Sequence, residues 1–352
     1  AAACLTRVAN GHVNTLRADV AAYPLAPFLG RVLGYIASPP CQTFSMAGDG
    51  TGREHLALLC ECVRGILLGR LTYDEAMSRL EVAGALDDKD GSPDPRNGLI
   101  LIPARVIRAL LDHDGKGPTD LEWVALEQVP PAGLVFDAYA NTLRELGFSV
   151  AAPVINAADY GVPQTRERKF VLASRTRRVT VPEPTHAKGG EEATIFGPGR
   201  LPWVSMARAL GWLGTVAHKR GAGMAEDLDA LLEARRAGSD KFDGHWAEDR
   251  PATVIASREI VQHPGATKNR FNDSDKTRND GIRITEAEGG ILQGFPADYR
   301  WEGTSKGKRW EQIGNVVCPP VARRVVAELL GVDPAPAPWH AYAWAEAPVP
   351  FG

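Results

Sequence analysis

The stretch that decides the fold is Val32-Leu33-Gly34-Tyr35-Ile36-Ala37-Ser38-Pro39-Pro40-Cys41. Its first six residues are apolar or small and they run into a polar, proline-containing turn, which is typical of a central strand in a parallel sheet. Two similar runs follow, Trp-Val-Ala-Leu at 123–126 and Phe-Val-Leu-Ala at 170–173. We therefore expect three buried strands at the centre of the fold.

Apolar residues at helical spacing separate these strands. The spacing predicts helices over 55–68, 104–111 and 136–146. Near the end of the chain, two prolines and a glycine predict a helix over 319–330, because proline favours the first turn and glycine the position after the last. Strands that alternate with helices indicate an α/β fold with a doubly wound sheet.

Composition excludes several classes of protein. The chain has 352 residues, of which 44% are hydrophobic and 24% charged, as in an ordinary globular protein. It contains no apolar run of about 18 residues and no apolar segment behind a basic start, so we expect neither a membrane helix nor a signal peptide. Five cysteines without a regular framework favour a reducing compartment, the cytoplasm. A net charge of −3 leaves only local basic surfaces for binding nucleic acid.

The regular alternation of strands and helices stops near residue 179. Residues 179–281 are rich in glycine, proline and charged residues and are predicted to form a smaller inserted domain. The main domain would then comprise 1–178 and 282–332, followed by a tail rich in proline and aromatic residues at 333–352. The acidic segment 74–95 is predicted to be a solvated loop.

Cys41 lies on a loop stiffened by two prolines, directly after the first predicted strand. Ligands and reactive groups of α/β proteins lie at this end of the sheet. An isolated cysteine is more often a small buried apolar residue, so the neighbouring sequence has to decide between the two interpretations.

Residues 38–45, Ser-Pro-Pro-Cys-Gln-Thr-Phe-Ser, resemble the nucleophile loop of the DNA cytosine-5 methyltransferase family. Further elements follow in the order of that family and extend the resemblance over residues 1–330. They are Glu127-Gln128-Val129, Gln164-Thr165-Arg166-Glu167-Arg168, Leu292-Gln293-Gly294-Phe295-Pro296 and Gln312-Ile313-Gly314-Asn315-Val316-Val317. The resemblance implies a Rossmann-like S-adenosylmethionine-dependent methyltransferase domain, with a target-recognition domain at 179–281.

The resemblance also implies the reaction, methyl transfer to C5 of cytosine in double-stranded DNA. Cys41 would add to C6 of a cytosine flipped out of the duplex, because C5 becomes nucleophilic only after this addition. Glu127 matches the carboxyl group near N3 and the exocyclic amine, and Arg168 matches the guanidinium at O2. Arg166 is expected to brace the catalytic loop or the DNA backbone. The expected substrate-binding residues are Pro40, Gln42, Ser45 and Gln164.

The methyl donor implied by the resemblance is S-adenosylmethionine, with no metal. Asp19 matches the acidic position beside the adenine, and Asn315 matches the block that closes on the donor; Pro39 and Val316 complete the expected donor-binding set. The family's glycine-rich strand, turn and helix have no counterpart, and residues 1–10 resemble the helix that comes after them. We therefore expect half of a donor pocket, beside a sheet that exposes apolar surface where its first strand is missing.

The expected partners are double-stranded DNA and a cognate restriction endonuclease, with the chain acting on DNA as a monomer and without a membrane. Basic residues of the inserted segment are candidates for contacts with phosphates and guanines: Lys241, His245, Arg250, Arg258, Lys268, Arg270, Lys276 and Arg278. Two alternatives stay open. One is a catalytically silent or fragmentary relative that binds DNA; the other, a methyltransferase for RNA, is disfavoured by the size of the insertion.

Overall fold

The computed structural model describes residues 2–40, 43–44, 54–87, 90–92, 95–195, 199–210, 260–262, 281–283 and 285–334. Its main sheet contains β1 (Gly34–Ala37), β2 (Trp123–Gln128), β3 (Ser149–Ala151), β4 (Val154–Asn156) and β5 (Glu167–Ser174). The strand order is β1-β2-β5-β3, with β4 also paired to β5. All three predicted strands are confirmed, and among the described residues β1 forms one edge of the sheet.

The strand directions differ from the prediction. β1 and β2 are parallel, but β5 runs antiparallel to β2, β3 and β4. Parallel neighbours need a crossover of about a dozen residues, usually a helix, whereas β4 ends at Asn156 and β5 begins at Glu167 after a single 3-10 turn, η4 (Ala157–Tyr160). The short connection reverses the chain. A buried apolar run shows no direction, so the expectation of a parallel third strand was wrong.

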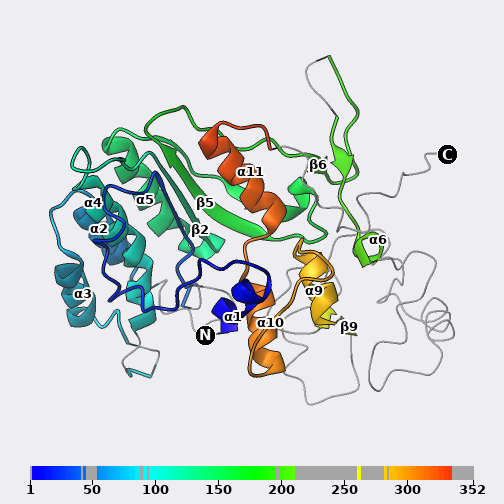
Figure 1. Cartoon of the computed structure of the whole chain (residues 1–352), viewed down its shortest axis with the longest axis horizontal. Coiled ribbons are helices and arrows are strands. Elements are labelled where there is room, and N and C mark those ends of the chain that lie inside the picture. Colours follow the sequence, from blue (N-terminus) through cyan, green and yellow to red (C-terminus); the bar gives the residue numbers. More distant parts are fainter. Residues whose placement is uncertain are drawn as a thin grey trace.

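Helices cover both faces of this sheet (Figure 1). On one face, α2 (Leu56–Leu67) packs against α4 (Ile102–Leu111) and α5 (Gly133–Glu145). Short 3-10 helices lead into the last two: η2 (Pro95–Leu101) precedes α4, and η3 (Pro130–Ala132) precedes α5. On the other face, α11 (Pro319–Leu330) packs against β2 and β5 and ends at Gly331, which has a φ of 67°. The four predicted helices are confirmed, and the sheet with helices on both faces is the expected α/β architecture.

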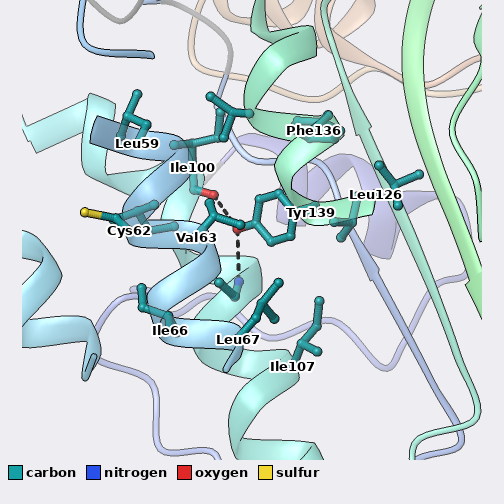
Figure 2. Close-up of a cluster of buried hydrophobic side chains, with 14 of the residues drawn as sticks. Leu59, Cys62, Val63, Ile66, Leu67, Ile100, Ile107, Leu126, Phe136 and Tyr139 are labelled. Carbon is teal, nitrogen blue, oxygen red and sulfur yellow. Dashed lines mark hydrogen bonds between the residues drawn. The ribbon is translucent and has the colours of Figure 1, made fainter. Parts of the chain in front are cut away.

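The larger core contains one tyrosine hydroxyl at its centre (Figure 2). Tyr139 is fully buried; its hydroxyl donates to the carbonyl of Ile100 at 2.7 Å and accepts from the N–H of Ala104 at 3.0 Å. The first N–H groups of a helix have no partner within it, so Tyr139 satisfies one of them at the start of α4. Burial raises the pKa of Tyr139 well above its usual value, and the phenol stays neutral.

A helix replaces the first part of the predicted acidic loop, residues 74–82. α3 spans Tyr73–Val82 and begins with a capping box, in which Thr72 and Glu75 bind each other's backbone N–H groups. Ala76 and Leu80 on this helix are fully buried in the main core. The prediction of a solvated loop was wrong over residues 74–82, because it overlooked the Thr-x-x-Glu signature of a helix start and a buried pair four residues apart.

The first helix contacts the C-terminal part of the chain. α1 (Ala2–Ala9), predicted over 1–10, lies beside α10 (Lys306–Asn315), which follows α9 (Glu286–Leu292) (Figure 1). The Thr6 hydroxyl accepts from the N–H of Glu302 at 2.8 Å, and the Asn10 amide exchanges hydrogen bonds with the backbone of Arg300 at 2.8 and 3.0 Å. The two ends of the domain are therefore joined through the segment that leads into α10.

The predicted inserted domain lies mostly outside the described residues, and so does the tail from residue 335. The part that is described contains β6 (His186–Ala187), β7 (Leu201–Pro202), α6 (Met206–Leu210), β8 (Ile260–Gln262) and β9 (Gly281–Arg283). β6 pairs with β7, and β8 pairs with β9. Within the described ranges, no helix is long and apolar enough to span a bilayer.

Candidate active site

A polar cavity of about 250 Å³ opens where β1 and β2 end. Its lining comes from the loop after β1, the end of β2, the start of β5 and the end of α10: Ser38, Pro39, Pro40, Glu127, Gln128, Val129, Arg166, Arg168 and Asn315. Six residues predicted from the sequence to act in catalysis or binding are among them. Cys41, Gln42 and Ser45 lie outside the described residues, on the continuation of the loop that begins at Ser38.

Glu127 and Arg168 form an ion pair in this cavity. Arg168 Nε lies 3.1 Å from Glu127 Oε1, and the two side chains are 15% and 13% exposed. Their strands are neighbours, which brings the two groups together. Burial raises the pKa of the Glu127 carboxyl, while Arg168, Arg166 and a hydrogen bond with Ser38 act in the opposite direction. The net effect is a carboxyl group that holds a proton more readily than an ordinary glutamate, as a general acid requires.

Gln128 connects the end of β2 to the loop that leads to Cys41. Its side-chain amide donates to the carbonyls of Pro39 at 3.0 Å and Pro40 at 3.3 Å, and its Oε1 accepts from the N–H of Val129 at 2.8 Å. The residue itself is 2% exposed. Its amide therefore ties the end of β2 to the backbone just before Cys41.

Arg166 and Gln164 contact the C-terminal part of the chain. Arg166 is 3% exposed and donates to the carbonyls of Gly314 at 2.9 Å and Val316 at 3.2 Å. These contacts lie at the junction of α10 and α11; the expected contact of Arg166 with the catalytic loop or DNA stays a prediction, because the loop from Cys41 onward lies mostly outside the described residues. Gln164 is fully buried, donates to Gln293 Oε1 at 2.9 Å and is not among the residues that line the cavity; its role as a substrate contact stays a prediction.

A second cavity, of about 450 Å³, adjoins the first along β1. It shares Ser38, Pro39 and Pro40 with the polar cavity, but most of its remaining lining is apolar: Val20, Tyr23, Leu25, Phe28, Val32, Gly34, Tyr35, Ile36, Ala37, Leu99, Ile102, Pro103, Val106 and Leu110. Burial raises the pKa of Tyr35 to about 12, so its phenol stays neutral. The start of the Cys41 loop therefore separates two cavities of opposite character.

Of the four predicted donor-binding residues, Pro39 and Asn315 line a cavity, whereas Asp19 and Val316 line neither. Pro39 lines both, and Asn315 lines the polar one. The carboxylate of Asp19 accepts from the N–H of Ala21 at 2.9 Å and lines neither cavity, although the adjacent Val20 lines the apolar one. The carbonyl of Val316 accepts a hydrogen bond from the Arg166 guanidinium.

Comparison with known proteins identifies the family of the chain. The model for the C-5 cytosine-specific DNA methylases matches residues 125–196 and 216–331, together more than half of the chain. The chain belongs to this family. The matched segments contain Glu127, Arg168 and Asn315, so the polar cavity of this C-5 cytosine-specific methylase is built largely from family sequence.

Two bacterial Type II methylases are similar to this chain. It is 28% identical to the Type II methylase M.HgiDII of Herpetosiphon aurantiacus over 58% of the chain, and the match spans 63% of that protein's length. It is 24% identical to the Type II methyltransferase M.SacI of Streptomyces achromogenes over 91% of the chain and 78% of that protein. The solved Entamoeba histolytica methyltransferase EhMeth shares the fold, with a TM-score of 0.52 and 13% identity over 94% of this chain and 87% of that one.

Sequence reasoning missed a buried polar residue behind the site. Gln293 is fully buried, donates to the carbonyl of Ile313 at 2.6 Å and accepts from Gln164. Cys318 lies beside it, with Sγ 3.3 Å from Gln293 Oε1, and burial raises the pKa of this thiol to about 11. A signal was present, because Gln293 interrupts an apolar stretch that starts with Ile291 and Leu292. A buried glutamine implies partners that only the folded chain identifies.

Proposed function

We propose that this methylase transfers a methyl group from S-adenosylmethionine to C5 of cytosine in double-stranded DNA. The observation that carries the proposal is the buried pair of Glu127 and Arg168 in a cavity at the start of the Cys41 loop. A carboxyl group with a raised pKa suits protonation of a ring nitrogen, and a guanidinium suits an exocyclic oxygen. Cytosine presents these groups side by side at N3 and O2.

In the proposed reaction, the Cys41 thiolate forms a bond to C6 while Glu127 protonates N3 and Arg168 stabilises the charge that develops at O2. The ring becomes an enamine with a nucleophilic C5. S-adenosylmethionine, when bound, supplies the electrophilic methyl group. After C5 has been methylated, its proton passes to water and the thiolate of Cys41 leaves C6, which restores the aromatic ring. Glu127 returns to its starting state by taking the N3 proton back.

The residues around the two cavities fit this donor by their chemistry. The apolar cavity suits a purine ring, because such rings bind between apolar walls. Val20 and Pro39 would hold the donor on this side, and the Asn315 amide would bind it from the polar cavity. Asp19, whose carboxylate binds the backbone of the next turn, is proposed as the acidic residue near the adenine.

The polar cavity has the scale of a single base rather than of a duplex, which supports flipping of the target cytosine out of the helix. The inserted segment 179–281 is proposed as the target-recognition domain. Because the named relatives are Type II enzymes, we extend the proposal to a restriction–modification system with a partner endonuclease, and to a monomer on DNA in the cytoplasm.

The test is mass spectrometry of nucleosides from unmethylated DNA incubated with the purified chain and S-adenosylmethionine. 5-Methylcytosine formed by the wild type and absent with Cys41→Ala would support both the reaction and the nucleophile. Turnover by Cys41→Ala would contradict the role of this thiol. DNA binding without any product would instead favour the silent DNA-binding relative.

A further inference from the structure

The C-terminal end of α10 is capped by side chains from outside the helix. The last four carbonyls of an α-helix have no partner within it. In α10, the carbonyl of Ile313 accepts from Gln293 Nε2 at 2.6 Å, and the carbonyl of Gly314 accepts from the Arg166 guanidinium at 2.9 Å. The same guanidinium binds the carbonyl of Val316, just beyond the helix, at 3.2 Å. Two residues distant in sequence thus terminate this helix.

Both capping side chains are themselves fixed. Gln293 is fully buried, and its Oε1 accepts from Gln164 Nε2 at 2.9 Å. Gln164 also donates to the carbonyl of Leu292 at 3.1 Å. The backbone N–H of Arg166 donates to Asn156 Oδ1 at 3.2 Å, which holds the start of β5. Buried polar groups that bind one another in this way have few alternative arrangements.

The cap surrounds one residue of the cavity. Arg166 binds the carbonyls of Gly314 and Val316, the two neighbours of Asn315, and Asn315 lines the cavity with Glu127 and Arg168. A guanidinium at a helix C-terminus also interacts favourably with the negative end of the helix dipole. The contacts fix the backbone on either side of Asn315, where this residue lines the cavity.

We propose that Arg166 and Gln293, joined through Gln164, are positioning residues that cap α10 and present Asn315 to the methyl donor. The part of this inference that names the donor rests on the proposed function; the cap itself does not. Arg166 then acts on donor binding through Asn315, while Arg168, two residues further along β5, acts on the base. The Gln-x-Arg-x-Arg segment would thereby act on both the methyl donor and the target base.

The first test is hydrogen exchange of the whole chain, comparing Arg166→Met with Arg309→Met. Arg309 is the matched control, because it is an arginine of α10 that binds Glu286 at 2.7 Å, away from the capped end. We expect amides of residues 312–318 to exchange at least about tenfold faster in Arg166→Met, with those of β2 unchanged and with no such effect of Arg309→Met. Unchanged protection of 312–318 in folded Arg166→Met would overturn the cap.

A second variant, Arg166→Lys, tests the cap if Arg166→Met does not fold. It keeps the charge but loses the fork that reaches two carbonyls, so we expect an intermediate increase of exchange at 312–318. Wild-type protection in this variant would count against the cap as well.

The second readout is the Kd for S-adenosylhomocysteine, measured by calorimetry. We expect Arg166→Met and Asn315→Ala each to raise it about tenfold, equivalent to about 1.4 kcal/mol, and Arg309→Met to leave it unchanged. Exchange at 312–318 should stay at wild-type rates in Asn315→Ala. Faster exchange at 312–318 in Arg166→Met together with an unchanged Kd would refute the positioning role. If the wild type does not bind S-adenosylhomocysteine, the proposed donor is contradicted. The exchange result then tests the cap independently.

Discussion

Replacement of Gln128 by leucine tests whether this side chain holds the loop that leads to Cys41. Leucine keeps a comparable volume but removes both donors and the acceptor of the amide. The carbonyls of Pro39 and Pro40 and the N–H of Val129 then lose their partner. Because Pro40 lies at the surface, its carbonyl can bind water instead.

The expected loss of stability follows from the two less accessible groups. The hydrogen bond to Pro39 contributes about 0.5–1.5 kcal/mol, and leaving the buried N–H of Val129 unpaired costs about 1–3 kcal/mol. We therefore expect the free energy of unfolding to fall by about 1.5–4.5 kcal/mol. The methylation rate should fall by about 10- to 100-fold, since misplacement of a reacting group by about 1 Å has an effect of this order.

Urea unfolding followed by tryptophan fluorescence gives the stability, and nucleoside mass spectrometry gives the rate. The matched control is Asn97→Leu, since Asn97 is 1% exposed, donates to the carbonyl of Ala85 at 2.8 Å and lines neither cavity. This control should lose stability as well but methylate at the wild-type rate where it is folded. A rate for Gln128→Leu equal to that of the control, or a loss of stability below about 0.5 kcal/mol, would refute the role of Gln128.

Three further substitutions test the Glu127 carboxyl, the packing of β1 against β2, and helix α3. Burial raises the folded-state pKa of Glu127, so its contribution to stability is complete below the unfolded-state pKa and is lost as the pH rises through the folded value. The unfolding free energy of Glu127→Gln relative to wild type should therefore increase as the pH rises above the pKa of an ordinary glutamate, measured by urea titrations at several pH values, while methylation falls. A difference that does not change with pH would contradict the raised pKa. Gly34→Ala would place a methyl group into the Trp123 ring of the neighbouring strand, so we expect a loss of about 1–3 kcal/mol in thermal unfolding, against none if the ring can move aside freely. Leu80→Ala should cost about 2–4 kcal/mol in urea unfolding because this side chain is fully buried, whereas a residue of a solvated loop would change stability by less than about 0.5 kcal/mol.

Much of the local structure could be predicted. Helices and strands carry their own hydrophobic period, so the predicted bounds agree with α2, α5 and α11 to within a few residues. The capped start of α3 was also readable at Thr72 and Glu75, and was missed because acidic residues dominate that segment. The direction of β5 was not readable, since it depends on how the chain returns from β4.

The candidate site divides in the same way. The residue types at positions 127, 166, 168 and 315 are apparent in the sequence, and the folded chain places all four on one cavity. The sequence does not show which partners these side chains bind. Gln164 and Arg166 stand in one short segment with Arg168, yet the first two bind the C-terminal part of the chain and the third pairs with Glu127.

The alternation of strands and helices, the family and the residue types of the site could be predicted, because each depends on residues close together along the chain. Long-range packing, by contrast, brings Gln128 to the Pro39–Pro40 loop and Arg166 to the end of α10. Arg166 and Gly314 are 148 residues apart in sequence, and Gln128 and Pro39 are 89 apart. Hydrogen bonds over such separations are fixed by packing of the elements that carry them, and no local pattern records them.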